Sequence, residues 1–317
     1  MNRRDLLKTA LLSVPALLGG GFTTSCGSSG GSGPGPSPNP TPSPPAPACT
    51  SGAHATGLTF AGASRLSGIV PAPVATQSGP VTPATYFSLD DVSLLSRMGY
   101  GVLLPPIGDQ GQQSSCVGWG VGYATSTFFN QLASATGPVT SPASQASPAD
   151  LYAKLLQKEL LACGNGTKVA DALDIMLTQG VDALASSQYS DQVCSFPSAQ
   201  DQFFLNGYTV LDLTNLTLIK QHIANLSVIP LGIVVYPDFE AASGPAVYSP
   251  SSGNCSLGGH CVALVGYDDS RQAFRIMNSW GTGWGDGGFL WVAYNAFPTI
   301  VQEAYLPIGG FWPNSLW

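Results

Sequence analysis

Charged residues are scarce in this chain, and those present are weighted toward acid. They make up 9% of the 317 residues, and 18 Asp and Glu against 11 Lys and Arg give a net charge of −7. A protein that binds the phosphate backbone of a nucleic acid needs clustered positive charge, so the composition excludes nucleic acid as a partner. Hydrophobic residues make up 44% of the chain, which excludes a protein that is disordered throughout.

The sequence also lacks long apolar runs, apart from one near its N-terminus. Residues 6–22 are mostly apolar but include Pro15 and three successive glycines, so the run is too short and too glycine-rich to span a bilayer stably. A protein with several membrane spans is therefore excluded. With Arg3 and Arg4 in front of it, the segment resembles a bacterial twin-arginine export signal. A plain secretory signal with two chance arginines is the alternative.

Cys26 closes this N-terminal segment and resembles the acylated cysteine of a lipoprotein, although Thr23 stands where such sites usually have leucine. Residues 27–48 are almost entirely Gly, Ser and Pro, which is typical of a flexible tether. We therefore expect an exported protein of the cell envelope, in the periplasm or on the outer surface, with a lipid on Cys26 as its sole membrane contact. An ordinary cleaved signal and a soluble product are the alternative.

Three regions follow from these shifts in composition. Residues 1–26 form the signal with its lipidation cysteine, residues 27–82 a tether and low-complexity arm, and residues 83–317 one folded domain. Between residues 50 and 83 the sole charge is Arg65, and no helical period is visible. We expect a linker or a loosely packed arm there and recognise no prosegment in it.

The folded domain is predicted to be α+β, because helices come first and strands later. Ser147 and Pro148 are a typical helix start, and Gly180 is a typical helix stop. The predicted helices span residues 116–135, 148–161, 167–179 and 215–225. The predicted strands span residues 231–236, 261–267, 273–278 and 289–293.

The chain has three histidines, and their positions narrow the choice of a catalytic base. His54 lies in the low-complexity arm, and His222 is expected on a solvated helix face. His260 stands between glycines and an apolar strand, at a strand mouth. Cys116 opens the longest predicted helix, where the helix dipole should lower the pKa of the thiol. A thiol nucleophile needs an imidazole partner, so we pair Cys116 with His260.

Three segments carry a family resemblance. They are DQGQQSSC at 109–116, GGHCVALVGY at 258–267 and MNSWGTGWGDGGF at 277–289. In this order they resemble the papain-like cysteine peptidases, and CGNG at 163–166 is a weaker match. Two departures stand beside the nucleophile, because Gln113 replaces a usual Cys and Val117 a usual Trp. They put substrate preference more in doubt than chemistry.

The resemblance implies a papain-like α+β fold, with a helical lobe, a β-rich barrel-like lobe and the active cleft between them. It implies that Cys116 is the nucleophile, His260 the general base and acid, and Asn278 the group that orients the imidazole. Gln110 would donate to the oxyanion together with the backbone of Cys116. Trp280 would shield the site, and the substrate-binding positions would be Gly166, Val234 and Gly259.

The implied reaction is peptide hydrolysis through a thioester acyl-enzyme, on a peptide or protein substrate, by a monomer. No cofactor is implied, and no His, Cys and Asp cluster has zinc-ligand spacing. Two alternatives stay open. One is a catalytically silent fold that binds peptides, and the other is an acyl-transferase or amidase that acts on envelope material.

The seven cysteines must be assigned one by one. With Cys26 acylated and Cys116 free, five remain, and export favours disulfides. The resemblance suggests Cys163–Cys194, since the family bridges similar segments, and the second expected pair is Cys255–Cys261. Cys49 would then be unpaired, or would pair with Cys26 if that residue carries no lipid.

Overall fold

A computed structural model describes residues 52–61, 83–134, 138–195, 201–253 and 255–309. The predicted signal, Cys26 and most of the predicted tether lie outside the described residues. In the part of the chain that is described, no helix combines the length and apolar character needed to cross a membrane.

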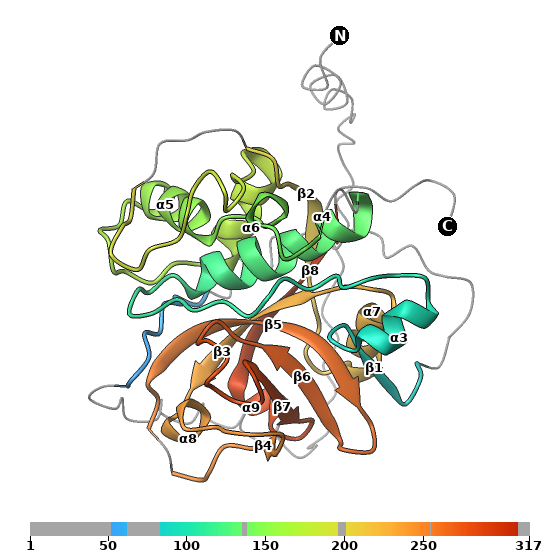
Figure 1. The fold of residues 1–317 in the computed structure, drawn as a ribbon. Helices are drawn as coiled ribbons and strands as arrows, with labels where there is room; N and C mark the ends of the chain where they lie inside the picture. Colours follow the sequence, from blue (N-terminus) through green and yellow to red (C-terminus); the bar gives the residue numbers. More distant parts are fainter. Residues whose placement is uncertain (1–51, 62–82, 135–137, 196–200, 254, 310–317) are drawn as a thin grey trace, which may run out of the picture. The chain divides into compact units, whose positions relative to one another are not determined.

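Helices gather on one side of the molecule (Figure 1). They are the π-helical stretch η1 (Gly118–Ser126), α4 (Thr127–Ser134), the 3-10 turn η2 (Pro142–Ser144), α5 (Pro148–Glu159) and α6 (Val169–Thr178). The short helix α3 (Val92–Arg97) lies apart from this group, beside the sheet. The predicted helix at 116–135 is formed, because Cys116 and Val117 are helical and lead into η1 and α4. Its middle takes π geometry, which is frequent at functional sites.

Local signals explain where these helices begin and end. The Ser147 side chain accepts a hydrogen bond from the Asp150 backbone at 3.1 Å, and Pro148 occupies the first turn of α5. Two glycines let η1 pack closely on its neighbours. A Cβ on Gly118 would lie 2.5 Å from the Pro148 carbonyl oxygen, and one on Gly120 would lie 2.6 Å from the Cys261 sulfur. The helix that begins at Cys116 is therefore held against both α5 and the sheet.

An eight-stranded sheet forms the other side (Figure 1), in the order β2-β8-β3-β5-β6-β7-β4 with β1 paired to β5. All pairs are antiparallel except β4 with β7. The strands are β1 (Tyr86–Ser88), β2 (Leu205–Val210), β3 (Ile229–Val235), β4 (Val247–Tyr248), β5 (Gly258–Asp268), β6 (Ala273–Met277), β7 (Phe289–Ala293) and β8 (Val301–Gly309). Three further helices accompany it: α7 (Leu216–Ala224), α8 (Pro237–Glu240) and α9 (Phe297–Ile300).

The α+β prediction is confirmed, with a helical region and an antiparallel sheet. The four predicted strands correspond to β3, β5, β6 and β7, whereas β2 and β8 were not predicted. His222 corrects another expectation, because α7 buries it to 8% exposure instead of leaving it in solvent. The cause is the packing of α7 on β5 and β1.

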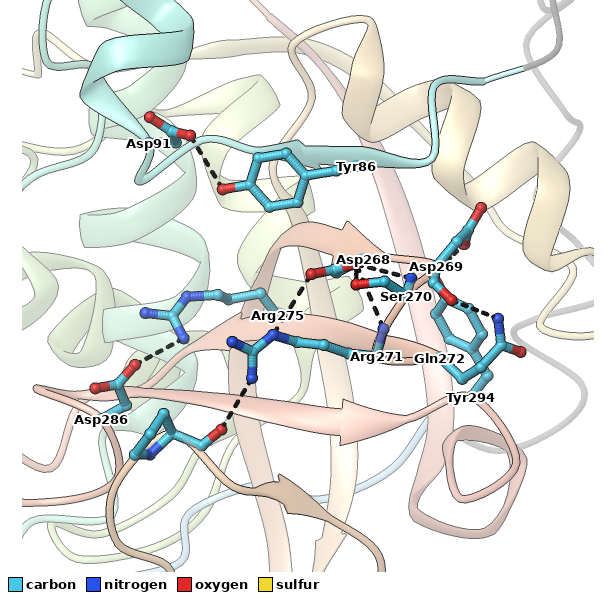
Figure 2. A network of polar contacts seen from close by, with 11 residues as sticks. Tyr86, Asp91, Asp268, Asp269, Ser270, Arg271, Gln272, Arg275, Asp286 and Tyr294 are labelled. Atoms are coloured by element: carbon cyan, nitrogen blue, oxygen red, sulfur yellow. Dashed lines mark hydrogen bonds and ion pairs between the residues drawn. The ribbon is translucent and has the colours of Figure 1, made fainter.

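A buried arginine joins the residues that follow β1 to the β6–β7 hairpin, and Figure 2 shows its contact with Asp286. Arg275 in β6 donates from Nε to Asp90 at 2.9 Å and from a terminal nitrogen to Asp286 at 3.1 Å. Its guanidinium carbon lies 4.9 Å from the ring centres of Phe289 and Trp291. Two carboxylates and two aromatic faces therefore surround one charge.

Candidate active site

Cys116 begins its helix at the junction of the helical part and the sheet. Its side chain is fully buried, with 0% exposure. The backbones of Cys261, the residue after His260 in β5, and of Gly57 lie close enough to its sulfur to act on its pKa. The fold thus brings the first and second sequence motifs together, as predicted, and adds a segment that was not expected there.

His260 and Asn278 form the second part of the site. His260 Nε2 lies 2.7 Å from Asn278 Oδ1, and that oxygen also accepts the Ser279 backbone N–H at 2.8 Å. An oxygen placed in this way accepts from Nε2, so the neutral imidazole carries its proton there. The other ring nitrogen, Nδ1, is buried without a hydrogen-bond partner. Nδ1 is therefore the nitrogen that can take a proton from a thiol.

Gln110 reaches the same place from a loop that pairs with the third motif. Its backbone N–H donates to the Ser279 carbonyl at 2.9 Å, and its side-chain oxygen accepts from the Ser279 hydroxyl at 2.8 Å. This second bond turns the amide nitrogen Nε2 toward the site. Nε2 donates to the carbonyl oxygens of Gln113 at 2.9 Å and Ala55 at 3.1 Å. A carbonyl oxygen can therefore be held where the resemblance places an oxyanion.

Trp280 covers the imidazole. The two ring centres are 4.5 Å apart, and Trp280 is buried at 4% exposure. Its other stacking partner is His54, at 4.6 Å with the rings 8° from parallel. Phe239 and Trp284 complete an aromatic cluster around Trp280. The Trp280 ring thus packs on the imidazole whose hydrogen bond to Asn278 is buried, at the place where the resemblance implies a shield.

Residues 52–61, which we call the covering segment, run across all of these groups. The prediction of a linker or loosely packed arm is wrong for this stretch, because backbone bonds fix it on both sides. Leu58 donates to Gly259 at 3.0 Å, Thr59 donates to Thr167 at 3.0 Å, and Gly57 accepts from Thr167 at 2.8 Å. His54, set aside in the sequence, is part of the same segment.

The side chain of Leu58 anchors the covering segment. It is 8% exposed, and a Cβ on Gly232 would lie 2.8 Å from its Cδ2. The same Cβ would lie 2.9 Å from Glu303 Oε1, a buried carboxylate oxygen without a hydrogen-bond partner. Burial raises the pKa of Glu303, while hydrogen bonds from Ala61 and Tyr305 act to lower it. The Leu58 side chain thus lies in a buried space beside Gly232 that also contains the Glu303 carboxylate.

The predicted substrate-binding residues are distributed around the covering segment. A Cβ on Gly166 would lie 2.9 Å from the Gly57 carbonyl, and one on Gly259 would lie 2.5 Å from the Leu58 oxygen. Val234 pairs with Gly259 in the β3–β5 register. Sequence analysis missed Gly232 and Glu303. A glycine inside an apolar strand and an acid within the alternating run of β8 were the signals that could have found them.

Burial keeps both Cys116 and His260 in their neutral forms. Burial raises the pKa of the Cys116 thiol to about 12, and the nearby backbones of Cys261 and Gly57 offset only part of this. Burial also lowers the pKa of His260 to about 4, against the hydrogen bond to Asn278. The expected low thiol pKa is therefore wrong for this closed arrangement, because desolvation outweighs the helix dipole.

The cysteines correct one pairing and confirm another. Cys163 and Cys194 form the predicted disulfide, with Cα atoms 5.7 Å apart. The predicted Cys255–Cys261 bond is wrong, because Cys261 is a free buried thiol. Cys261 lies within β5, and its sulfur points under Gly120 in the helical part. Cys255 is nevertheless disulfide-bonded.

One group of carboxylates among the described residues could hold a cation. Asp150, Asp182 and Asp201 have oxygens within 4.8 Å of one another. Lys154 contacts two of them, Asp150 at 2.8 Å and Asp201. A lysine already balances this charge, and the group includes none of the residues that surround Cys116.

Comparisons with known proteins agree with this geometry. A family model described as papain family cysteine protease matches residues 97–308. Cathepsin K of Gallus gallus is 28% identical over 218 residues, which cover 67% of this chain and 61% of that protein. Digestive cysteine proteinase 2 of Homarus americanus is 28% identical over 204 residues, or 60% and 58% of the two chains. The chain thus spans about three fifths of the length of these curated relatives.

Solved structures show the same fold. Xylellain, a cysteine protease from Xylella fastidiosa, superposes with a TM-score of 0.58 at 20% identity, covering 72% of this chain and 87% of that one. ProCathepsin B S9 from Trypanosoma congolense gives 0.59 at 15% identity, with coverage of 81% and 87%. The fold is the papain-like α+β fold. With the family model matched over residues 97–308, the chain belongs to the papain family of cysteine proteases.

Proposed function

We propose that this chain is a thiol peptidase whose Cys116 attacks a peptide carbonyl and forms a thioester acyl-enzyme. His260 Nδ1 takes the thiol proton and passes it to the leaving amine, and the same nitrogen then activates the water that releases the acid. Gln110 Nε2 stabilises the developing oxyanion. The observation that carries the proposal is the Asn278–His260 hydrogen bond, which leaves the buried Nδ1 without a hydrogen-bond partner and so able to take a proton.

The covering segment makes the described arrangement a resting form of this peptidase. A peptide substrate needs the same backbone partners, Gly166–Thr167 and Gly259, that the covering segment occupies. The Ala55 carbonyl also occupies the donor Nε2 of Gln110. Activity therefore requires that residues 52–61 leave the site.

The place of action is a separate part of the proposal. The arginine pair, the short apolar run and Cys26 support export to the cell envelope, with a lipid on Cys26 and the Gly, Ser and Pro tether between lipid and domain. The peptidase acts there as a monomer on peptides or proteins. Metabolic labelling with a fatty acid, lost in Cys26→Ser, tests the anchor.

Hydrolysis after release of the covering segment tests the function. The full chain carries an inserted site for a sequence-specific protease within residues 62–82, is cut and is then reduced with a dithiol. A mixture of peptides serves as substrate, and mass spectrometry identifies cleaved bonds. The expected result is hydrolysis that Cys116→Ala abolishes and that Cys261→Ala, which removes the other free buried thiol, leaves in place.

Hydrolysis that survives Cys116→Ala would overturn the proposal. A reactive Cys116 without any hydrolysis would favour the peptide-binding alternative. Added amines that appear in the products would instead favour acyl transfer.

A further inference from the structure

Cys255 has a disulfide partner that can be identified by elimination. Of the seven cysteines, Cys163 and Cys194 bond to each other, and Cys116 and Cys261 are free. Cys255 is disulfide-bonded. Two cysteines remain for it, Cys26 and Cys49, and both precede the covering segment in the chain.

The first described residues of the covering segment bring the chain close to Cys255. A Cβ on Gly52 would lie 3.3 Å from the Leu257 side chain, and the Thr56 hydroxyl donates to the Leu257 carbonyl at 3.4 Å. Leu257 is two residues from Cys255, and Cys49 is three residues from Gly52. Three residues span up to roughly 10 Å, and the two Cα atoms of a disulfide lie about 4.4–6.8 Å apart. Cys49 is therefore within reach.

We propose that a Cys49–Cys255 disulfide fastens the covering segment to the catalytic domain and makes release of the peptidase depend on reduction. The inference rests on the proposed function, since it concerns what uncovers Cys116. The segment is then held at both ends, by the disulfide at its N-terminal end and by the chain through residues 62–82 at its C-terminal end. A cut within residues 62–82 breaks the C-terminal link of the covering segment and leaves the disulfide intact.

Reduction of this disulfide is a thiol–disulfide exchange with a dithiol. One thiolate of the dithiol attacks a sulfur of the Cys49–Cys255 bond and forms a mixed disulfide, and its second thiol then displaces the protein sulfur. The dithiol ends as a disulfide, and Cys49 and Cys255 each gain a proton and become thiols. Two electrons pass from the dithiol to the protein.

How fully the covering segment occupies its site depends on its effective concentration there. A segment joined to its site by a short link acts at a local concentration of about 1 mM, whereas a released segment in a 10 µM solution acts at about a hundredfold less. Cutting alone should therefore leave Cys116 covered. Cutting with loss of the disulfide should uncover it.

The experiment compares three forms of the full chain, each with a protease site inserted within residues 62–82. They are the wild-type sequence, the double variant Cys49→Ser with Cys255→Ser, and the matched control Cys26→Ser. Each is cut without reductant. Denaturing, non-reducing electrophoresis and mass spectrometry then show whether the two fragments are joined, and iodoacetamide labelling of Cys116 shows whether the site is open.

We expect the cut wild type and Cys26→Ser to remain one covalent species with slow labelling. The double variant should separate into two fragments and label up to about a hundredfold faster. A cut wild type or Cys26→Ser that separates without reductant overturns the proposal, as does equal labelling in joined and separated forms. The fragment pattern does not depend on peptidase activity, so failure of the proposed function and failure of this inference give different results.

Discussion

At the scale of single residues, burial of Cys116 and His260 ties the stability of the fold to pH. Burial raises the pKa of the Cys116 thiol from 9.0 to about 12, so it favours the folded over the unfolded chain below pH 9, and this contribution is lost as the pH rises through 9 toward 12. Burial lowers the pKa of His260 from 6.5 to about 4, so it favours the folded chain above pH 6.5, and this contribution is lost as the pH falls toward 4. The two groups therefore favour the folded chain most between these limits.

The free energy of unfolding should therefore gain most from these two groups between about pH 6.5 and 9. Urea denaturation at a series of pH values measures it. His260→Gln removes the buried imidazole and should reduce the loss of stability below pH 6.5. A free energy of unfolding that falls as steeply below pH 6.5 in His260→Gln as in the unsubstituted chain would contradict this account.

Gln110 tests the oxyanion role with a neighbouring glutamine as control. Gln110→Ala removes the donor Nε2 and should lower kcat by about 10²–10³ in the released enzyme. Gln113 is a buried amide three residues away, whose side chain donates to Val193 at 3.0 Å instead. Gln113→Ala should leave kcat within about threefold while lowering stability by about 1 kcal/mol. Equal kcat for the two variants would exclude the assigned role of Gln110.

At the scale of elements, the covering segment lies against the domain like one extra strand, and Leu58 is its buried hydrophobic side chain. Leu58→Ala removes most of a buried leucine, which is worth about 2 kcal/mol, or a factor of about 30 in occupancy. We expect Cys116 in the intact Leu58→Ala chain to be alkylated about 10- to 30-fold faster than in the unsubstituted chain. Thr59→Ala is the control, since that side chain is exposed, and it should change the rate by less than about twofold. An unchanged rate in Leu58→Ala would show that this contact does not hold the segment.

The helices around the candidate site could be predicted because their signals are local. Ser147, Pro148 and Gly180 mark helix ends through their own backbone chemistry, and α5 and α6 lie within two residues of the predicted bounds. The order of the three motifs indicated which side chains would meet. The structure then supplied the distance between His260 and Asn278 and the role of Ser279 in orienting Gln110.

The covering segment could not be predicted because its binding is not encoded locally. It has no charge run and no helical period, and its hold comes from backbone bonds to Thr167 and Gly259, more than 100 residues away. The pairing of the cysteines is likewise not encoded in the local sequence. Cys255 and Cys261 are close in sequence, but β5 points Cys261 into the interior, where it meets Gly120.

At the scale of the whole molecule, stability depends on joining the N-terminal strand to the late hairpin. Arg275 does this through Asp90 and through Asp286, the second contact being visible in Figure 2, and Arg275 is 8% exposed. Arg271 lies four residues earlier over the same Trp291 ring, but its side chain is 44% exposed and its nearest acid, Asp268, is at 3.4 Å. The two arginines thus offer a buried and an exposed version of one interaction.

Urea denaturation should separate these two arginines. Arg275→Ala leaves two partly buried carboxylates without their donor and should lower the free energy of unfolding by about 2–3 kcal/mol. Arg271→Ala should lower it by less than about 1 kcal/mol, because exposed ion pairs contribute little. A larger loss for Arg271→Ala would show that burial does not decide the strength of these pairs.

The measurement that tests the central claim most directly is the rate of Cys116 alkylation against pH, before and after the covering segment is released by cutting and reduction. The account predicts slow labelling of the intact chain between pH 5 and 8, and fast labelling of the released domain well below the ordinary thiol pKa of 9.0. His260→Ala should abolish the fast reaction at low pH. Equal profiles before and after release, or a released Cys116 that reacts only as an ordinary thiol, would contradict it.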